Sequence, residues 1–300
     1  MQSSGSEHDS PPPGTEPTKL SVSTTFFEEA RLMGAAKPDL VLLSADSVAF
    51  YVHLVRIRAM STNSLCGFLP DQLPPPSTEL GLSLPTVALP DNSSVLNIIL
   101  HAVYTLDATR YNPSIEMLTV AVTSLIDVYG VPMQIVLAPS APLYTALLVQ
   151  VTLRPMQVYT LAAHYDLEDI ATAASAYLLS YPLSAISDTD AEYMGGRYLK
   201  RLFFLHCGRV ERLKTLLGRP PSPHPPTQLC DSSEQNKIAR AWSLGTAFLV
   251  FNASPDTAAT TIETSLQPLV AQIWCADCRA ILHDRIGQLV LDWSSVRRTI

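Results

Sequence analysis

The stretch Asp39-Leu-Val-Leu-Leu-Ser-Ala-Asp-Ser-Val-Ala-Phe-Tyr-Val-His-Leu54 holds two β-rich runs that are separated by a polar turn. The first run is compact and apolar, and the second is rich in β-branched and aromatic residues. Two such runs on either side of Ser44-Ala-Asp46 predict a β-hairpin. A third short strand is predicted at 86–89, after a loop over 70–85 whose prolines exclude a central strand.

Beyond residue 91 the apolar residues recur with a period of about 3.6, which is typical of helices. Helices are predicted at 94–105, from Asn112 to Gly130, from Pro155, from Asp166, and at 198–217, 232–251, 256–273 and 276–298. We expect Asn112 and Asp166 to cap the helices that follow them. Seven side chains on periodic faces are expected to be buried, namely Val41, Val52, Leu100, Leu125, Leu161, Phe203 and Trp293.

The order of the elements predicts an α+β fold, in which a small sheet with helices precedes a mostly α-helical C-terminal region. Residues 1–24 are rich in Ser, Pro and Gly and nearly free of large apolar groups, so they predict a disordered tail. The remaining parts are an α+β domain at 25–185, a helical extension at 186–217, a Pro-rich linker at 218–230 and a helical region at 231–300.

Composition excludes several classes of protein. Hydrophobic residues make up 47% of the 300-residue chain, enough for a sizeable core, and charged residues make up only 16%. Such a low share of charge argues against a coiled coil or a disordered acidic protein. With 20 basic and 27 acidic residues the net charge is −7, which makes the chain a poor generic binder of nucleic acid.

The sequence points to a soluble protein of the cytoplasm or the nucleus. The polar N-terminus lacks the basic start and apolar core of a secretory signal, and no apolar run reaches the ~18 residues of a membrane span. An odd, sparse set of cysteines is not a disulfide framework. The five cysteines are Cys66, Cys207, Cys230, Cys275 and Cys278.

The strand-forming residues resemble the opening of a BTB/POZ domain, in which an Asp-led strand pairs with a strand that ends in His. Here these are the stretches from Asp39 and from Phe50 to His53, followed by apolar and Ser positions at Ile57, Ala59 and Ser61. The stretches 87–105 and 159–169 resemble the family's third strand with its helix and its later helix pair. This resemblance implies a fold that is used for dimerisation or for docking a partner protein.

From about residue 37 to the end, the chain also resembles a group of fungal BTB-domain proteins, which brings no biochemical activity with it. The shared features are Tyr198-Leu-Lys-Arg-Leu-Phe-Phe-Leu-His206, a Pro-His-Pro-Pro linker, a Cys-x-x-Cys and a Trp-Ser-x-Val-x-Arg-Thr-Ile ending. BTB domains commonly have a basic residue directly after the histidine that ends the second strand, whereas this chain has Leu54 at that position. A charged partner groove is therefore not expected, and no MATH, Kelch or zinc-finger domain follows to support a ubiquitin-ligase adaptor.

No motif of catalysis or cofactor binding is present. The chain lacks a Gly-x-Gly-x-x-Gly, a P-loop, a Gly-x-Ser-x-Gly and a His-Glu-x-x-His. His53 and His206 are interpreted as structural histidines, and His164 with Glu168 as a polar helix corner. The acidic run 188–192 is interpreted as the first turn of a helix that Ser187 caps. We therefore predict no catalytic residue, no cofactor and no small-molecule substrate.

Cys275-Ala-Asp-Cys278 allows two interpretations. It is a standard half-site for structural zinc, with His224 and Cys230 as the remaining ligands. Alternatively, both thiols begin one apolar helical face and are packing groups, as buried free cysteines often are. That face continues through Leu282, Ile286, Leu289, Trp293 and Val296. Because no second half-site with tight spacing exists, packing is preferred and no metal site is predicted.

The sequence thus predicts a non-catalytic protein-interaction module, whose partner is another protein or a second copy of the chain. Self-association is expected through 26–33 and the helix at 94–105, mainly by apolar contacts. Two alternatives stay open. One is a structural scaffold that binds a helix through its C-terminal seam, and the other is an enzyme whose site the sequence does not reveal.

Overall fold

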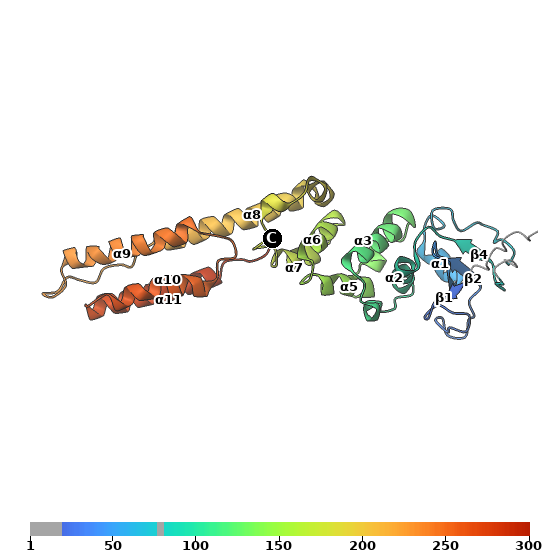
Figure 1. The fold of residues 1–300 in the computed structure, drawn as a ribbon, viewed down its shortest axis with the longest axis horizontal. Helices are drawn as coiled ribbons and strands as arrows, with labels where there is room; N and C mark the ends of the chain where they lie inside the picture. Colours follow the sequence, from blue (N-terminus) through green and yellow to red (C-terminus); the bar gives the residue numbers. More distant parts are fainter. Residues whose placement is uncertain (1–19, 77–80) are drawn as a thin grey trace, which may run out of the picture. The chain divides into compact units, whose positions relative to one another are not determined.

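The structure is a computed structural model that describes residues 20–76 and 81–300. It has the predicted α+β class, with a small mixed sheet followed by a mostly helical C-terminal region. The chain divides into two compact units, Met1–Ala146 and Leu147–Ile300 (Figure 1). None of the helices in the described ranges has the length and apolar content that crossing a membrane requires.

The first unit contains a four-stranded sheet in the order β1-β3-β2-β4. Its strands are β1 (Ser21–Val22), β2 (Leu40–Leu43), β3 (Val48–Val52) and β4 (Thr86–Ala88). The predicted hairpin is confirmed, since β2 and β3 are antiparallel with Leu40 opposite Val52. The predicted third strand is β4, which lies parallel to β2.

The expected disordered tail at 1–24 is wrong at its C-terminal end. Ser21 and Val22 pair in parallel with Val48 and Ala49 of β3. Main-chain hydrogen bonds hold this edge strand, and the polar composition of the segment gives no sign of them. Residues 1–19 of the expected tail lie outside the described residues.

The helices of the first unit follow the sheet. They are α1 (Leu54–Met60), α2 (Ser93–Val103), η1 (Thr109–Tyr111), α3 (Ile115–Thr123), η2 (Ser124–Val128) and α4 (Met133–Val136), with α5 (Pro142–Gln150) at the boundary between the units. The prediction that Asn112 caps a helix is wrong, because it ends η1 with a φ of 46°. Ser114 caps α3 instead and accepts from the amide of Met117.

His53 links the end of β3 to the segment before β2 and to the end of α2. Its Nδ1 lies 3.0 Å from the hydroxyl of Tyr104, its Nε2 lies 3.2 Å from the carbonyl of Ala36, and its side chain is buried. The carboxylate of Asp39 accepts from the amide of Leu54 at 2.7 Å. His53 therefore has the predicted structural role, although it is more deeply buried than the half-buried position expected.

Of the two segments expected to mediate self-association, the helix at 94–105 belongs largely to the core of its unit, whereas 26–33 is only partly buried. Phe26 is fully buried and its ring contacts those of Phe50 and Tyr104. Most of α2, from Val95 to Val103, is buried as well. The helix at 94–105 therefore offers little apolar surface, whereas Phe27 and Met33 in the segment 26–33 are each 39% exposed.

The second unit consists of helices. They are α6 (Pro155–His164), α7 (Glu168–Ser175), η3 (Leu183–Ala185), α8 (Asp188–Leu217), α9 (Ser232–Phe251), α10 (Ala259–Ala271) and α11 (Ala276–Ser294). Ser187 caps α8 as predicted and accepts from the amide of Asp190 at 3.1 Å. The prediction that Asp166 caps a helix is wrong, since Leu167 holds that position and Asp166 accepts from Arg197 and Tyr198 instead.

The boundary between the units falls inside 25–185, which the sequence analysis expected to be one domain. The helix pair α6 and α7 belongs to the second unit, because α6 packs on both α7 and α8. One link between α6 and α8 is the hydroxyl of Tyr159, which donates to the carbonyl of Tyr198 at 2.8 Å.

Helices α8 to α11 share one apolar core, and Figure 1 shows α9 lying alongside α10 and α11. Its buried members are Leu213, Leu216, Leu217, Trp242, Leu249, Ile262, Leu266, Leu282, Ile286, Leu289 and Trp293. The indole of Trp242 donates to the carbonyl of Leu217 at 2.9 Å, and Arg285 donates to that of Leu216 at 2.8 Å. These bonds satisfy the last carbonyls of α8 inside the bundle.

Six of the seven expected core residues are buried, and Phe203 is the exception with 44% of its surface exposed. Helix α8 turns Leu202 and His206 inward instead.

Leu125→Ala should lower the free energy of unfolding by about 2–5 kcal/mol, because it leaves a cavity in a closed core. Phe203→Ala should change it by only about 0.5 kcal/mol. Denaturant unfolding of the two variants measures the difference, and equal losses would contradict these burial assignments.

Candidate metal centre

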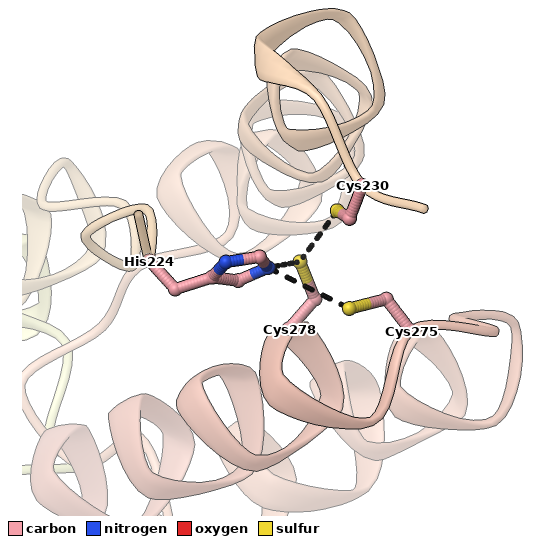
Figure 2. A group of neighbouring side chains, drawn as sticks. All are labelled: His224, Cys230, Cys275 and Cys278. Carbon is pink, nitrogen blue, oxygen red and sulfur yellow. Dashed lines mark hydrogen bonds between the residues drawn. The ribbon is translucent and has the colours of Figure 1, made fainter. Parts of the chain in front are cut away.

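Four side chains that are far apart in the sequence meet at one end of the helical bundle. His224 and Cys230 come from the Pro-rich linker before α9, and Cys275 and Cys278 come from the start of α11. Their ligand atoms all lie within 4.8 Å of one another (Figure 2). In the described part of the chain this is the one group of His, Cys, Asp and Glu side chains that is suited to hold a metal ion.

The spacing of the ligand atoms is close to that of a tetrahedral zinc site. Cys230 Sγ lies 3.6 Å from Cys278 Sγ, and His224 Nε2 lies 3.1 Å from Cys278 Sγ and 3.5 Å from Cys275 Sγ. Zinc bound about 2.3 Å from sulfur places neighbouring ligand atoms about 3.8 Å apart. Small side-chain adjustments would thus suffice to surround an ion.

The start of α11 presents both of its cysteines to the same point. Cys275 is the N-cap, outside the helix, and Cys278 lies in the first turn. The predicted buried face is confirmed from Cys278 through Leu282 to Trp293, but Cys275 is partly exposed and does not belong to it. The packing interpretation therefore fits the buried Cys278 but not the partly exposed Cys275.

The linker is folded so that its two ligands reach α11. Thr227 and Cys230 form a tight turn, with the Thr227 amide donating to the Cys230 carbonyl at 2.9 Å and the Cys230 amide donating to Thr227 Oγ1 at 3.1 Å. Gln235 of α9 donates to the carbonyl of His224 at 3.0 Å. These bonds fix the end of the linker against the first turns of α9.

The histidine is oriented for coordination through Nε2. Its Nδ1 lies 2.7 Å from the carbonyl of Pro225, and because a carbonyl only accepts, Nδ1 carries the proton. The lone pair of the neutral ring is then on Nε2, which faces the three sulfurs (Figure 2). A carbonyl that holds the second ring nitrogen is the usual support for a histidine that binds zinc.

The environments of the thiols differ. The backbone amide of Cys278 at the helix N-terminus lowers the pKa of Cys275 to about 7, and burial raises the pKa of Cys278 to about 12. Burial also raises the pKa of Cys230. A bare thiolate at Cys278 or Cys230 is thus unfavourable, whereas a divalent cation between the sulfurs would keep all three deprotonated.

The donor set decides what the centre is able to do. Three sulfurs and one imidazole supply all four positions of a tetrahedral zinc ion, and none remains for water or substrate. Closed sites of this kind are structural. The soft sulfur ligands favour zinc over magnesium or calcium, which prefer oxygen.

The other singled-out residues do not gather into a site. His164 stacks on Tyr193 with ring centroids 4.0 Å apart, and Glu168 pairs with Arg201 at 2.5 Å. The hydrogen bond from Arg201 lowers the pKa of Glu168 to about 2. His206 is buried, and burial lowers its pKa. These observations agree with the structural roles predicted for them.

The sequence named all four members of the metal centre in one of its two interpretations, but it gave no ground to prefer ligation over packing. Cys-x-x-Cys marks one half of the site, whereas His224 is 54 residues away from Cys278 and has no motif of its own with Cys230. Comparison with known proteins adds nothing to this geometry, since no family model, curated protein or solved structure matches the chain.

Cys278→Ser should destabilise the bundle by more than about 2 kcal/mol when zinc is present, because it removes a buried ligand. Cys207→Ser, an exposed cysteine on α8, is the matched control and should change stability by about 0.5 kcal/mol or less. Thermal unfolding with and without a strong chelator separates ligation from packing. A loss of the same size in both conditions would favour packing alone.

Proposed function

We propose that this protein is a non-catalytic, zinc-binding protein in which one structural zinc ion ties the Pro-rich linker to the start of α11. The observation that carries the proposal is the approach of four ligand atoms to within 4.8 Å of one another. The orientation of His224 by the Pro225 carbonyl supports it, because it leaves Nε2 free to coordinate.

The ion would act beyond the buried core that the helices of the bundle share. Cys230 directly precedes Asp231, the N-cap of α9, and Cys275 is the N-cap of α11. The shared core of the bundle begins farther along, at Trp242 in α9 and at Leu282 in α11. Zinc at their first turns would therefore hold two helix ends together that the core reaches less well.

Zinc content tests this proposal directly. Protein purified without chelator, or reconstituted with zinc, should contain about one zinc ion per chain by elemental analysis, and removal of the ion should lower the melting temperature. Cys275→Ser should reduce the zinc content, and Cys66→Ser, an exposed cysteine in the first unit, should not. Full-length protein that binds no zinc even after reconstitution would refute the proposal.

A second function, protein binding, is favoured by the surface of α9. Leu244, Phe248 and Phe251 have exposed fractions of 77%, 66% and 89% and follow one another at helical spacings of four and three residues. Exposed aromatic side chains on one helical face are typical of a protein-binding surface. We propose this face as the contact for another protein or a second copy of the chain, in place of the buried helix at 94–105.

The resemblance to BTB/POZ domains supports the same function for the sheet-bearing part of the chain. The β2–β3 hairpin, its Asp39 and its terminal His53 stand in the order that the resemblance implies. We propose a BTB-like, partner-binding role for this part. Three thiols able to bind zinc also fit a reducing compartment, and we propose the cytoplasm or the nucleus.

Phe251→Asp should weaken association, because it places a charge within an apolar contact. Ser243→Asp lies on the same helix, is also exposed, and serves as the control for charge alone. Sedimentation velocity of the full chain at tens of micromolar should show a dimer that Phe251→Asp shifts toward monomer. A wild-type protein that stays monomeric and is unaffected by the substitution would contradict self-association through α9.

A further inference from the structure

A small cavity leads from solvent to the sulfurs of the metal centre. Its volume is about 160 Å³, and all three cysteines of the centre line it. The rest of its wall comes mainly from α9 and from the end of α10, including Ile238 and Leu269. A small solute in this cavity would therefore lie beside the three cysteines, although Cys230 and Cys278 are buried from bulk solvent.

Two of these sulfurs are already close to bonding distance. Cys230 Sγ and Cys278 Sγ are 3.6 Å apart, and both cysteines are free thiols. A disulfide requires about 2.05 Å between its sulfurs. Rotation of the side chains together with a small shift of the linker, which carries Cys230, would close this gap.

We propose that Cys230 and Cys278 form a peroxide-oxidisable pair, and that their disulfide expels the zinc ion. The zinc-release part of this inference rests on the proposed zinc-binding function. After oxidation only His224 and Cys275 would remain as ligands, and two ligands do not hold a structural zinc ion. The disulfide would keep the tether between the linker and α11 that the ion had provided.

The oxidant is hydrogen peroxide, and the reaction balances. Bound zinc would hold both sulfurs as thiolates. One of these thiolates attacks a peroxide oxygen, so that an S–O bond forms, the O–O bond breaks and hydroxide leaves. The second thiolate attacks that sulfur, which forms the S–S bond and displaces the oxygen as hydroxide. Two protons from the buffer convert the hydroxides to water, and the two sulfurs have lost two electrons to the peroxide.

The choice of pair follows from position. Cys66 and Cys207 are exposed, lie outside the cluster and are not among the residues that line the cavity. Within the cluster, the contact between Cys230 and Cys278 joins the segment before α9 to the first turn of α11. Oxidation at this contact would substitute one cross-link for another, so the helical bundle should stay folded.

The experiment uses the full chain with Cys66→Ser and Cys207→Ser, which removes the exposed thiols. The zinc-loaded protein is treated with hydrogen peroxide while a zinc-chelating dye reports free zinc. Release of about one zinc ion per chain, loss of two thiols and a cross-linked peptide that joins Cys230 to Cys278 are expected. A thiol reductant followed by zinc should restore binding.

Two further variants keep the outcome interpretable. Cys275→Ser preserves the pair and should still form the disulfide, whereas Cys230→Ser should not form it. The same peptide mapping on zinc-free protein tests whether Cys230 and Cys278 form a disulfide even if the protein binds no zinc. Absence of zinc binding would refute the proposed function but not the disulfide pairing. A bond between Cys275 and Cys278, or sulfinic acid without any disulfide, would overturn the pairing. Zinc that remains bound after the disulfide forms would overturn the release.

Discussion

The approach of the linker to the first turn of α11 is the constraint on which the C-terminal region depends. A proline-rich segment has few amide donors and rarely forms a helix or enters a sheet, so its path depends on what its polar side chains and its remaining backbone groups bind. Its polar side chains include His224, Thr227 and Cys230. The His224 ring contacts the carbonyl of Pro225, the Thr227 hydroxyl accepts from the amide of Cys230, and the Cys230 sulfur contacts that of Cys278. A metal ion at this point would convert a set of weak contacts into one strong one, which is how small metal sites add stability to short apolar cores.

Buried polar groups organise the rest of the second unit. Arg209 is nearly fully buried, stacks on Trp293 with its guanidinium carbon 4.3 Å from the ring centroid, and donates to the carbonyls of Pro255 and Val296. A buried guanidinium is costly unless its donors are satisfied, and here carbonyl oxygens accept from it. Burial lowers its pKa accordingly. The residue thus fixes the turn after α9 and the segment after α11 to α8.

The first unit is organised in the same way by a histidine and a carboxylate. The two ring nitrogens of His53 contact the hydroxyl of Tyr104 and the carbonyl of Ala36. The carboxylate of Asp91 accepts hydrogen bonds from the hydroxyls of Ser124 and Tyr129. Gly130, which has a φ of +62°, ends the helical segment, and its carbonyl accepts from Thr62. A Cβ at Gly130 would meet Asn63 at 2.8 Å, so glycine is required there both for its conformation and for the close approach. These bonds link segments that local propensity alone would leave independent.

The sequence by itself determined the elements, because apolar periodicity is a local property. The hairpin at 39–54, the α9 range 232–251 and the burial of Leu125 and Trp293 all follow from spacing along the chain. Tertiary structure decided what spacing does not encode. Phe203 faces solvent because the neighbouring side chains of α8 fill the core. Asp166 does not cap a helix, because its carboxylate accepts hydrogen bonds from Arg197 and Tyr198 of α8. Above all, His224 and Cys230 have no motif, and only the folding of the linker onto α11 brings them to Cys275 and Cys278. A site built from distant segments depends on chain reversals, and their geometry is set by packing rather than by local sequence.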